Sequence, residues 1–152
     1  MFQLKPIAYV RNNRDEVIDD NWGDMISEVE LTDEFSEESI QGIEEFSHLD
    51  VIFYMDQVED EQIQTKARRP RNNPNHPLVG IFAQRGKNRP NKLGVTTVKV
   101  IRLEGRNIIV QGLDAVNGTP VIDMKPVMKE FLPKGEVTQP TWTHDIMKNY
   151  WG

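Results

Sequence analysis

The stretch GIFAQRGKNRPNKLG, residues 80–94, carries side chains that could bind an anion. It contains four cations, Arg85, Lys87, Arg89 and Lys92. Gly86 and Pro90 favour turns, so the cations are expected on a loop. A loop fixed between two strands is a common place for a ligand site, although many polar loops are simply solvated. The stretch therefore predicts either a ligand-binding loop or a solvated connection between strands.

The charge of the chain is strongly segregated along the sequence. Residues 1–65 hold 18 acidic and 3 basic residues, whereas residues 66–92 hold 8 basic residues and no acidic one. The net charge is −6, which by itself does not favour nucleic-acid binding. A single basic block can still attract a phosphate or a carboxylate locally. The alternative is that these cations are solvated or pair with the acidic half of the fold.

Several classes of site lack their sequence signals. No G-x-G-x-x-G follows an expected strand, no phosphate-binding P-loop is present, and no serine lies in a nucleophile elbow. The chain has no cysteine, and His48, His76 and His144 are too far apart in sequence for a metal motif. The sequence thus predicts no metal site, no Rossmann cofactor site and no acyl-enzyme chemistry.

The ends and the apolar runs of the sequence bear on localisation. The start, MFQLKP, lacks the apolar core of a signal peptide, and no apolar run approaches the length of a membrane span. The absence of cysteine fits a reducing compartment. We therefore expect a cytoplasmic protein with no membrane partner.

Short apolar and β-branched runs, separated by glycine and proline turns, indicate the elements that hold the central loop. Strands are expected near residues 7–11, 26–31, 50–58, 78–82, 95–103, 108–111 and 121–125. The nearly continuous apolar run at 50–58 predicts a strand buried on both faces. One short helix is expected from the cap Ser36 towards Phe46. Residues 59–77 are expected to form an irregular connector.

This pattern predicts a mostly β protein, a sandwich or a barrel, at a length that suits one domain. We expect a compact single-domain β-barrel over residues 1–127 with one or two short helices. Residues 128–152, which we call the C-terminal arm, lose periodicity and include Trp142, Tyr150 and Trp151. The arm is expected to pack on the barrel or on another subunit. Trp22 either fills the core or stacks on a ligand.

Three ordered segments together resemble one family. They are GIEEFSHL at residues 42–49, GIFAQRGKNRPNKLG at residues 80–94 and GLDAVNGTPVIDMKP at residues 112–126. The chain is similar over residues 6–127 to the TrmO/YaeB-like (TsaA-like) S-adenosylmethionine-dependent tRNA methyltransferases. The resemblance implies a compact non-Rossmann β-barrel that forms a homodimer. It further implies N6-methylation of threonylcarbamoyladenosine next to the anticodon of tRNA.

The resemblance also implies which residues bind S-adenosylmethionine. The positions that match the cofactor loops of the family are Asn21, Trp22, Gly23, Asp56, Gln57, Arg85, Val95, Asn117, Gly118, Thr119 and Pro120. In this interpretation Arg85 pairs with the carboxylate, and the turn at Asn117 reads the purine. Arg89 and Asn91 brace the loop or face the substrate. Catalytic residues stay unknown, because the sequence isolates no general base.

The chain departs from the family pattern within these loops. Asp56-Gln57 replaces His-Gln, and Asn117 replaces the aspartate of Asp-Gly-Thr-Pro. Two alternatives to the tRNA methyltransferase therefore stay open. One is a non-catalytic barrel that binds S-adenosylmethionine or RNA, and the other is a methyltransferase acting on another small molecule.

Overall fold

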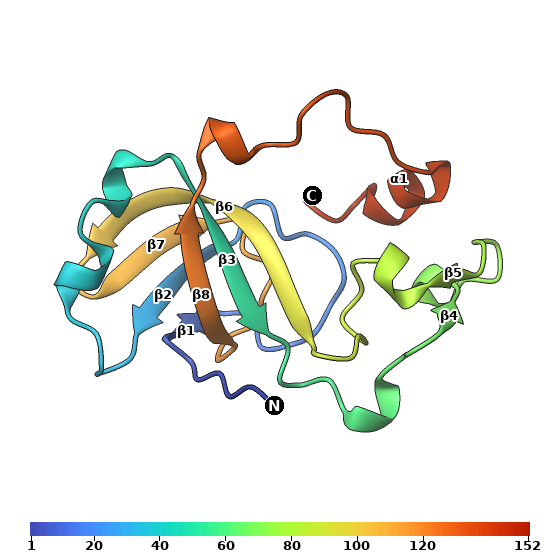
Figure 1. Cartoon of the computed structure of the whole chain (residues 1–152), viewed down its shortest axis with the longest axis horizontal. Helices are drawn as coiled ribbons and strands as arrows, with labels where there is room; N and C mark the ends of the chain where they lie inside the picture. Colours follow the sequence, from blue (N-terminus) through green and yellow to red (C-terminus); the bar gives the residue numbers. More distant parts are fainter.

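The computed structural model describes residues 1–152 and contains one closed antiparallel barrel (Figure 1). Its six strands are β1 (Ala8–Arg11), β2 (Ile26–Leu31), β3 (His48–Tyr54), β6 (Leu93–Glu104), β7 (Asn107–Gln111) and β8 (Pro120–Pro126). Their order around the barrel is β1-β2-β7-β6-β3-β8, and β8 closes onto β1. The prediction of a mostly β barrel is confirmed.

The barrel core is built from alternating residues of the strands. On β3, Leu49, Val51 and Phe53 point inward and are almost fully buried, whereas the residues between them are only partly covered. The prediction that this strand is buried on both faces is wrong, because an antiparallel barrel covers only its inner face. The strand also ends at Tyr54 rather than Val58. Fourteen buried residues form the core cluster.

A close contact explains one glycine of the barrel. Gly94 on β6 pairs with Phe53 on β3, and a Cβ atom on Gly94 would lie 2.6 Å from the Phe53 ring. A side chain at position 94 would therefore collide with a core aromatic ring at the start of β6. This contact fixes where the basic loop joins the barrel.

The helical segment after β2 is shorter than expected. Ser36 caps it as predicted, because its hydroxyl accepts a hydrogen bond from the backbone N–H of Glu38. The chain forms two separate 3₁₀ helices, Glu37–Ile40 and Ile43–Glu45. Gly42 separates them in the left-handed conformation, with φ of 95°. The continuous helix predicted towards Phe46 is thus wrong.

Residues 59–92 form a small lobe beside the barrel, which we call the lobe (Figure 1). It contains the two-residue strands β4 (Ala67–Arg68) and β5 (Val79–Gly80) and three 3₁₀ helices, Asp60–Gln62, Pro70–Asn72 and Ile81–Ala83. The strand predicted at residues 78–82 is therefore reduced to two residues. Leu78 and Phe82 are exposed, since β5 belongs to a small two-stranded sheet and not to the barrel.

The C-terminal arm leaves β8 and crosses to the lobe (Figure 1). It contains a 3₁₀ helix, Lys129–Phe131, and one α-helix, α1 (Thr141–Met147), which the sequence pattern did not indicate. Asp145 of α1 lies 3.3 Å from the imidazole of the buried His76 in the lobe. The helices of the chain are all too short and too polar to span a lipid bilayer.

Candidate functional site

The antiparallel topology brings the predicted site segments to one end of the barrel. β1 and β3 end there, β7 ends on the same side, and β2, β6 and β8 begin there, because neighbouring strands run in opposite directions. The connectors at this end are residues 12–25, 55–92 and 112–119. They carry nearly all of the predicted site residues, while Val95 lies near the start of β6 and Pro120 begins β8.

The segment Asn21–Trp22–Gly23 is held by the C-terminal arm. Its three consecutive backbone N–H groups donate to the carbonyl oxygens of Asn149, Tyr150 and Trp151, at 3.0, 2.8 and 2.9 Å respectively. A Cβ atom on Gly23 would lie 2.1 Å from the carbonyl oxygen of Trp151, so this close approach requires a glycine.

The same segment is held on its other side by Arg14. The Arg14 guanidinium donates to the carbonyl oxygens of Asp20, at 3.1 Å, and Asn21, at 2.8 Å. It also lies 4.0 Å from the centre of the Trp22 ring, a cation–π arrangement. Trp22 is 3% exposed. Of the two roles considered for it, the structure therefore shows the buried, packed one, with Arg14 over the ring.

Tyr150 anchors the arm inside this end of the barrel. Its hydroxyl donates a short hydrogen bond to one carboxylate oxygen of Asp114, and the other oxygen accepts from the hydroxyl of Thr96 at 2.5 Å. Burial raises the pKa of Tyr150, and the negative charge of Asp114 raises it further. The phenol is therefore neutral at physiological pH and acts as a donor.

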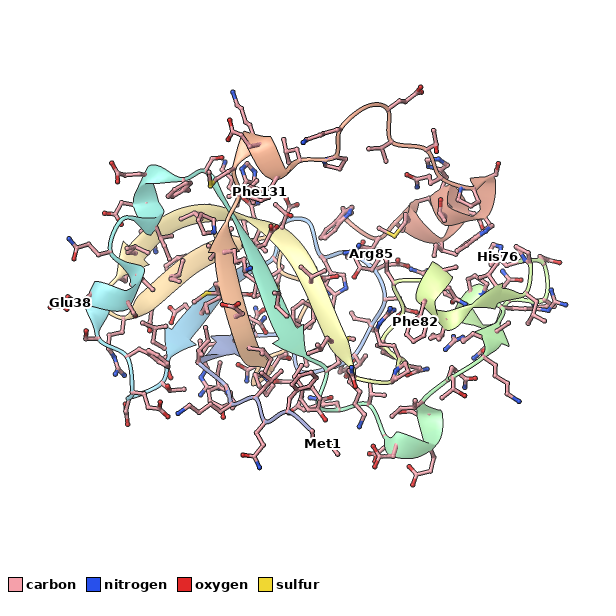
Figure 2. The ribbon with its side chains drawn as sticks, in the orientation of Figure 1. Met1, Glu38, His76, Phe82, Arg85 and Phe131 are labelled. Carbon is pink, nitrogen blue, oxygen red and sulfur yellow. The ribbon has the colours of Figure 1, made fainter.

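Arg85 lies next to this network, where the lobe meets the barrel (Figure 2). It donates to the carbonyl oxygen of Val95 at 2.8 Å, and Val95 directly precedes Thr96. Its positive charge also acts on the Tyr150 phenol, in the sense that lowers the pKa of that group. The guanidinium is exposed and has no carboxylate partner, so it keeps its charge and most of its donors for an anionic ligand.

The turn at residues 117–120 is joined to the same end of the barrel but is satisfied internally. The N–H groups of Asn117, Gly118 and Thr119 donate to carbonyl oxygens of Arg14, Val10 and Val116. The Asn117 side chain accepts from the N–H of Asn12 at 3.1 Å. In this conformation the turn has no backbone N–H left to read a purine. Its assignment to the cofactor stays a prediction.

Asp56 and Gln57 follow β3 in a turn, and both are exposed. Their side chains make no hydrogen bond, and nothing ties them to Arg85 or to the 117–120 turn. Two surface clefts, of about 370 and 200 Å³, include none of these residues either. Arg85, Val95 and residues 21–23 are thus linked through Thr96, Asp114 and Tyr150 by side-chain and backbone hydrogen bonds, and the Asn117 turn joins through Arg14. Asp56 and Gln57 lie at the same end of the barrel but have no hydrogen bond to these residues.

The basic loop is braced from within. The Arg89 guanidinium donates to the carbonyl oxygens of Gln84, at 2.8 Å, and Gly86, at 3.2 Å. This contact fits the bracing role considered for Arg89, while the Asn91 side chain makes no hydrogen bond. Lys92 has φ of 53° and pairs with Asp60 at 2.8 Å. The hydrogen bond from Lys92 lowers the pKa of Asp60 and raises that of Lys92.

Most cations of the lobe have no acidic partner. Arg71 pairs with Asp20 and Lys92 with Asp60. The other six, Lys66, Arg68, Arg69, Arg85, Lys87 and Arg89, form no ion pair, and those that make hydrogen bonds donate to neutral carbonyl groups. The acidic N-terminal part of the chain therefore neutralises only a quarter of the basic block. A surface of this kind attracts polyanions.

Sequence reasoning missed the residues that connect the site. The sequence patterns do not point to Arg14, Thr96 or Asp114, and they mark Tyr150 only as an aromatic residue of the arm. Asp114 lies within the segment GLDAVNGTP, so its position in the third motif was the available signal. Nothing local in the sequence indicated that a residue near the C-terminus would reach it.

The fold and site define a class: a small closed β-barrel with an exposed guanidinium at its loop end, unlike a Rossmann-type nucleotide binder. The model of the family described as "tRNA-methyltransferase O N-terminal domain" matches residues 20–131. The chain belongs to this family.

Relatives fall into two groups by length. A human tRNA (adenine(37)-N6)-methyltransferase is 33% identical over 113 residues, which cover 74% of this chain and 25% of that protein. A probable S-adenosyl-L-methionine-binding protein of Methanocaldococcus jannaschii is 32% identical over 126 residues, which cover 82% of this chain and 91% of that protein. The chain thus spans about a quarter of the human protein and nearly all of the archaeal one.

Solved structures share the fold. A crystal structure of TrmO superposes with a TM-score of 0.76 at 25% identity, covering 91% of this chain and 63% of the other. TrmO from Pseudomonas aeruginosa gives a TM-score of 0.73 at 24% identity, covering 91% and 61% of the two chains. These matches support the barrel architecture independently of the sequence motifs.

Proposed function

We propose that the protein is an S-adenosylmethionine-dependent methyltransferase that modifies the N6 nitrogen of threonylcarbamoyladenosine in tRNA, next to the anticodon. The observation that carries the proposal is the position of Arg85. Its charged, exposed guanidinium lies beside the network of Thr96, Asp114 and Tyr150, at the barrel end that gathers the family loops. Family membership and the names of the relatives support the same activity.

The donor set fits part of this cofactor. The guanidinium of Arg85 suits a carboxylate, since arginine can donate two parallel hydrogen bonds to it. S-adenosylmethionine supplies a methyl group on a sulfonium, which is already a good leaving group. The chain then needs mainly to hold and orient two reactants, so the lack of an identifiable general base is compatible with the activity.

The lobe is the part of the chain suited to tRNA. Six of its cations are free of carboxylates, and phosphate neutralisation supplies much of the affinity for nucleic acids. The overall net charge of −6 does not oppose this, because the acidic residues lie mostly in other segments. A small-molecule substrate would not require such a surface.

Calorimetric titration with S-adenosylmethionine tests the cofactor. The wild type is expected to bind, and Arg85→Ala to bind at least about tenfold more weakly, because a hydrogen bond to a charged group contributes roughly 1.5–3 kcal/mol. Arg102→Ala is the matched control, since Arg102 pairs with Glu104 on the barrel surface at 2.6 Å. Failure of the wild type to bind would rule out the proposal.

Transfer of a labelled methyl group to bulk tRNA tests the reaction. Label is expected in tRNA that carries threonylcarbamoyladenosine and in no other. A second candidate function is S-adenosylmethionine binding without transfer, which is favoured by the names of two relatives. The archaeal proteins that this chain covers almost completely are named as binding proteins. Tight cofactor binding with no labelled tRNA would support that alternative.

We further propose a homodimer in the cytoplasm. Large apolar side chains of the arm are exposed, among them Val137 at 66% and Phe131, which Figure 2 labels, at 83%. A subunit interface would remove these apolar side chains from water. Sedimentation of the wild type is expected to give twice the monomer mass, and Phe131→Ser to shift the equilibrium towards monomer. A monomeric wild type would exclude the dimer.

A further inference from the structure

The donors of the segment 21–23 are already used. All three of its backbone N–H groups bind carbonyl oxygens of the arm, and the carbonyl of Asn21 accepts from Arg14. A ligand cannot bind the N–H groups while the arm is docked. The absence of a side chain at Gly23, where a Cβ atom would lie 2.1 Å from the arm, shows that this segment is shaped to receive the arm. The segment therefore positions the arm.

The docked arm presents two aromatic rings at the site. Tyr150 is half-buried and tied to Asp114, while Trp151 remains 44% exposed. Their rings meet edge to face, with centroids 4.8 Å apart and planes at 82°. The anchored Tyr150 thus orients Trp151 at the end of the barrel where Arg85 lies.

The partly exposed Trp151 matches a need of the proposed cofactor. The 117–120 turn, which is predicted to read the purine, has its backbone N–H donors satisfied within the protein. An exposed aromatic ring provides another way to bind a purine, because stacking needs no free backbone donor. Tyr150 is more covered than Trp151 and its hydroxyl is bound to Asp114, so it suits anchoring the arm.

We propose that Tyr150 and Trp151 form a wall of the candidate site, and that Trp151 stacks on the purine of S-adenosylmethionine while Tyr150 holds the arm in place. This inference rests on the proposed function. It makes Tyr150 a positioning residue and Trp151 a binding residue. The site is then completed by a segment from the far end of the same chain.

Two independent changes displace the wall. Gly23→Ala introduces a Cβ atom where the carbonyl of Trp151 lies, so the arm must move. Gly80→Ala is the matched control, because Gly80 has φ of −62° and no atom within 4 Å of an added Cβ. Truncation after Lys148 removes the docking residues altogether. The core cluster lies within residues 8–121, so the barrel is expected to remain folded, which thermal unfolding followed by circular dichroism checks.

The readout is the dissociation constant for S-adenosylmethionine, measured by calorimetry. Gly23→Ala, the truncation and Trp151→Ala are each expected to weaken binding about tenfold, the range of one lost base–aromatic stack. Gly80→Ala and Trp142→Ala are expected to match the wild type, and Trp151→Phe to fall between. Tyr150→Phe, which keeps the ring but loses the Asp114 bond, is expected to weaken binding less than Trp151→Ala.

The possible failures can be told apart. Unchanged binding by the truncated protein would overturn the inference and make the arm a purely structural element. Tighter binding would also overturn it, because the arm would then occupy the cofactor position. If the wild type does not bind the cofactor, the proposed function fails, and the ligand assigned to Trp151 fails with it.

Discussion

Two regions at the same end of the barrel use their polar groups in opposite ways. The segments 21–23 and 117–119 have every backbone N–H bound to another part of the chain. The lobe, residues 59–92, keeps six cations without a carboxylate partner. Satisfied backbone groups stiffen a structure but offer little to a ligand, whereas uncompensated charge destabilises the protein slightly and attracts anions. We therefore propose that cofactor and tRNA are recognised by Arg85, the other lobe cations and the arm.

The largest effect on stability is expected from Asp114→Ala, which acts on the hydrogen bonds that hold the arm beside these segments. It leaves the hydroxyls of Thr96 and Tyr150 without their acceptor, and each buried unpaired group costs roughly 1–3 kcal/mol. We expect the free energy of unfolding to fall by about 2 kcal/mol or more in urea titrations. Asp114→Asn, which keeps one acceptor oxygen, is expected to lose less.

Asp123→Ala provides the control for that experiment. Asp123 is exposed on β8 and accepts a hydrogen bond only from the adjacent N–H of Met124. Its removal is expected to change stability by less than about 0.5 kcal/mol. If both variants lose the same free energy of unfolding, the hydrogen bonds around Tyr150 contribute no more to stability than an exposed carboxylate does.

Removing cations of the lobe should weaken tRNA binding and leave the stability of the protein nearly unchanged. Lys66→Gln with Lys87→Gln removes two cations that have no ion-pair partner. If both contact phosphates, the slope of the logarithm of tRNA affinity against the logarithm of salt concentration falls by about 1.4–1.8. Filter binding at several salt concentrations measures the slope.

The paired control removes two lysines of the arm, Lys129→Gln with Lys134→Gln. The net charge changes equally, so a general electrostatic effect would act on both variants. We expect the control to keep the wild-type slope. An equal reduction in both variants would mean that the lobe has no local role in RNA binding.

The loss of stability at alkaline pH tests the docking of the arm, because Tyr150 anchors the arm to Asp114. Because the pKa of Tyr150 is raised in the folded protein, the unfolded chain loses this proton first, above pH of about 10. Stability is therefore complete below that pH and falls above it, by up to about 1.4 kcal/mol per pH unit. Tyr150→Phe should lack this fall. We would measure urea unfolding from pH 8 to pH 11 for both proteins, and parallel curves would contradict the assignment.

The sequence was informative wherever structure depended on local pattern. The short apolar and β-branched runs near residues 95–103, 108–111 and 121–125 correctly indicated β6, β7 and β8. The apolar run at residues 78–82 was misleading. Only Val79 and Gly80 form a strand, which belongs to the lobe, and Phe82 is exposed. Local hydrophobicity does not say which sheet a strand joins.

The site was predictable only in part, for a related reason. Family motifs pointed to Arg85 and to residues 21–23, which the structure places in one connected network. They did not indicate that Tyr150 reaches Asp114, a contact that spans 36 positions in the sequence. Such contacts depend on how the arm returns over the barrel, and the local sequence pattern does not predict that long-range path.

The smallest expected effect concerns the one buried cation of the lobe. Lys92 pairs with Asp60, whose carboxylate is exposed, so solvent screens much of the interaction. The pKa of Asp60 is lowered, and its contribution to stability is therefore present above pH of about 4 and lost as the pH falls below that. Asp60→Asn should lower the urea midpoint slightly at pH 7, and the difference from the wild type should shrink as the pH falls below about 4. Lys92 has a left-handed backbone conformation next to the start of β6. Cofactor binding should change little in Asp60→Asn if the contact between Gly94 and Phe53 fixes where the loop joins the barrel. A loss of cofactor affinity as large as that of Arg85→Ala would instead make the Asp60–Lys92 pair part of the site.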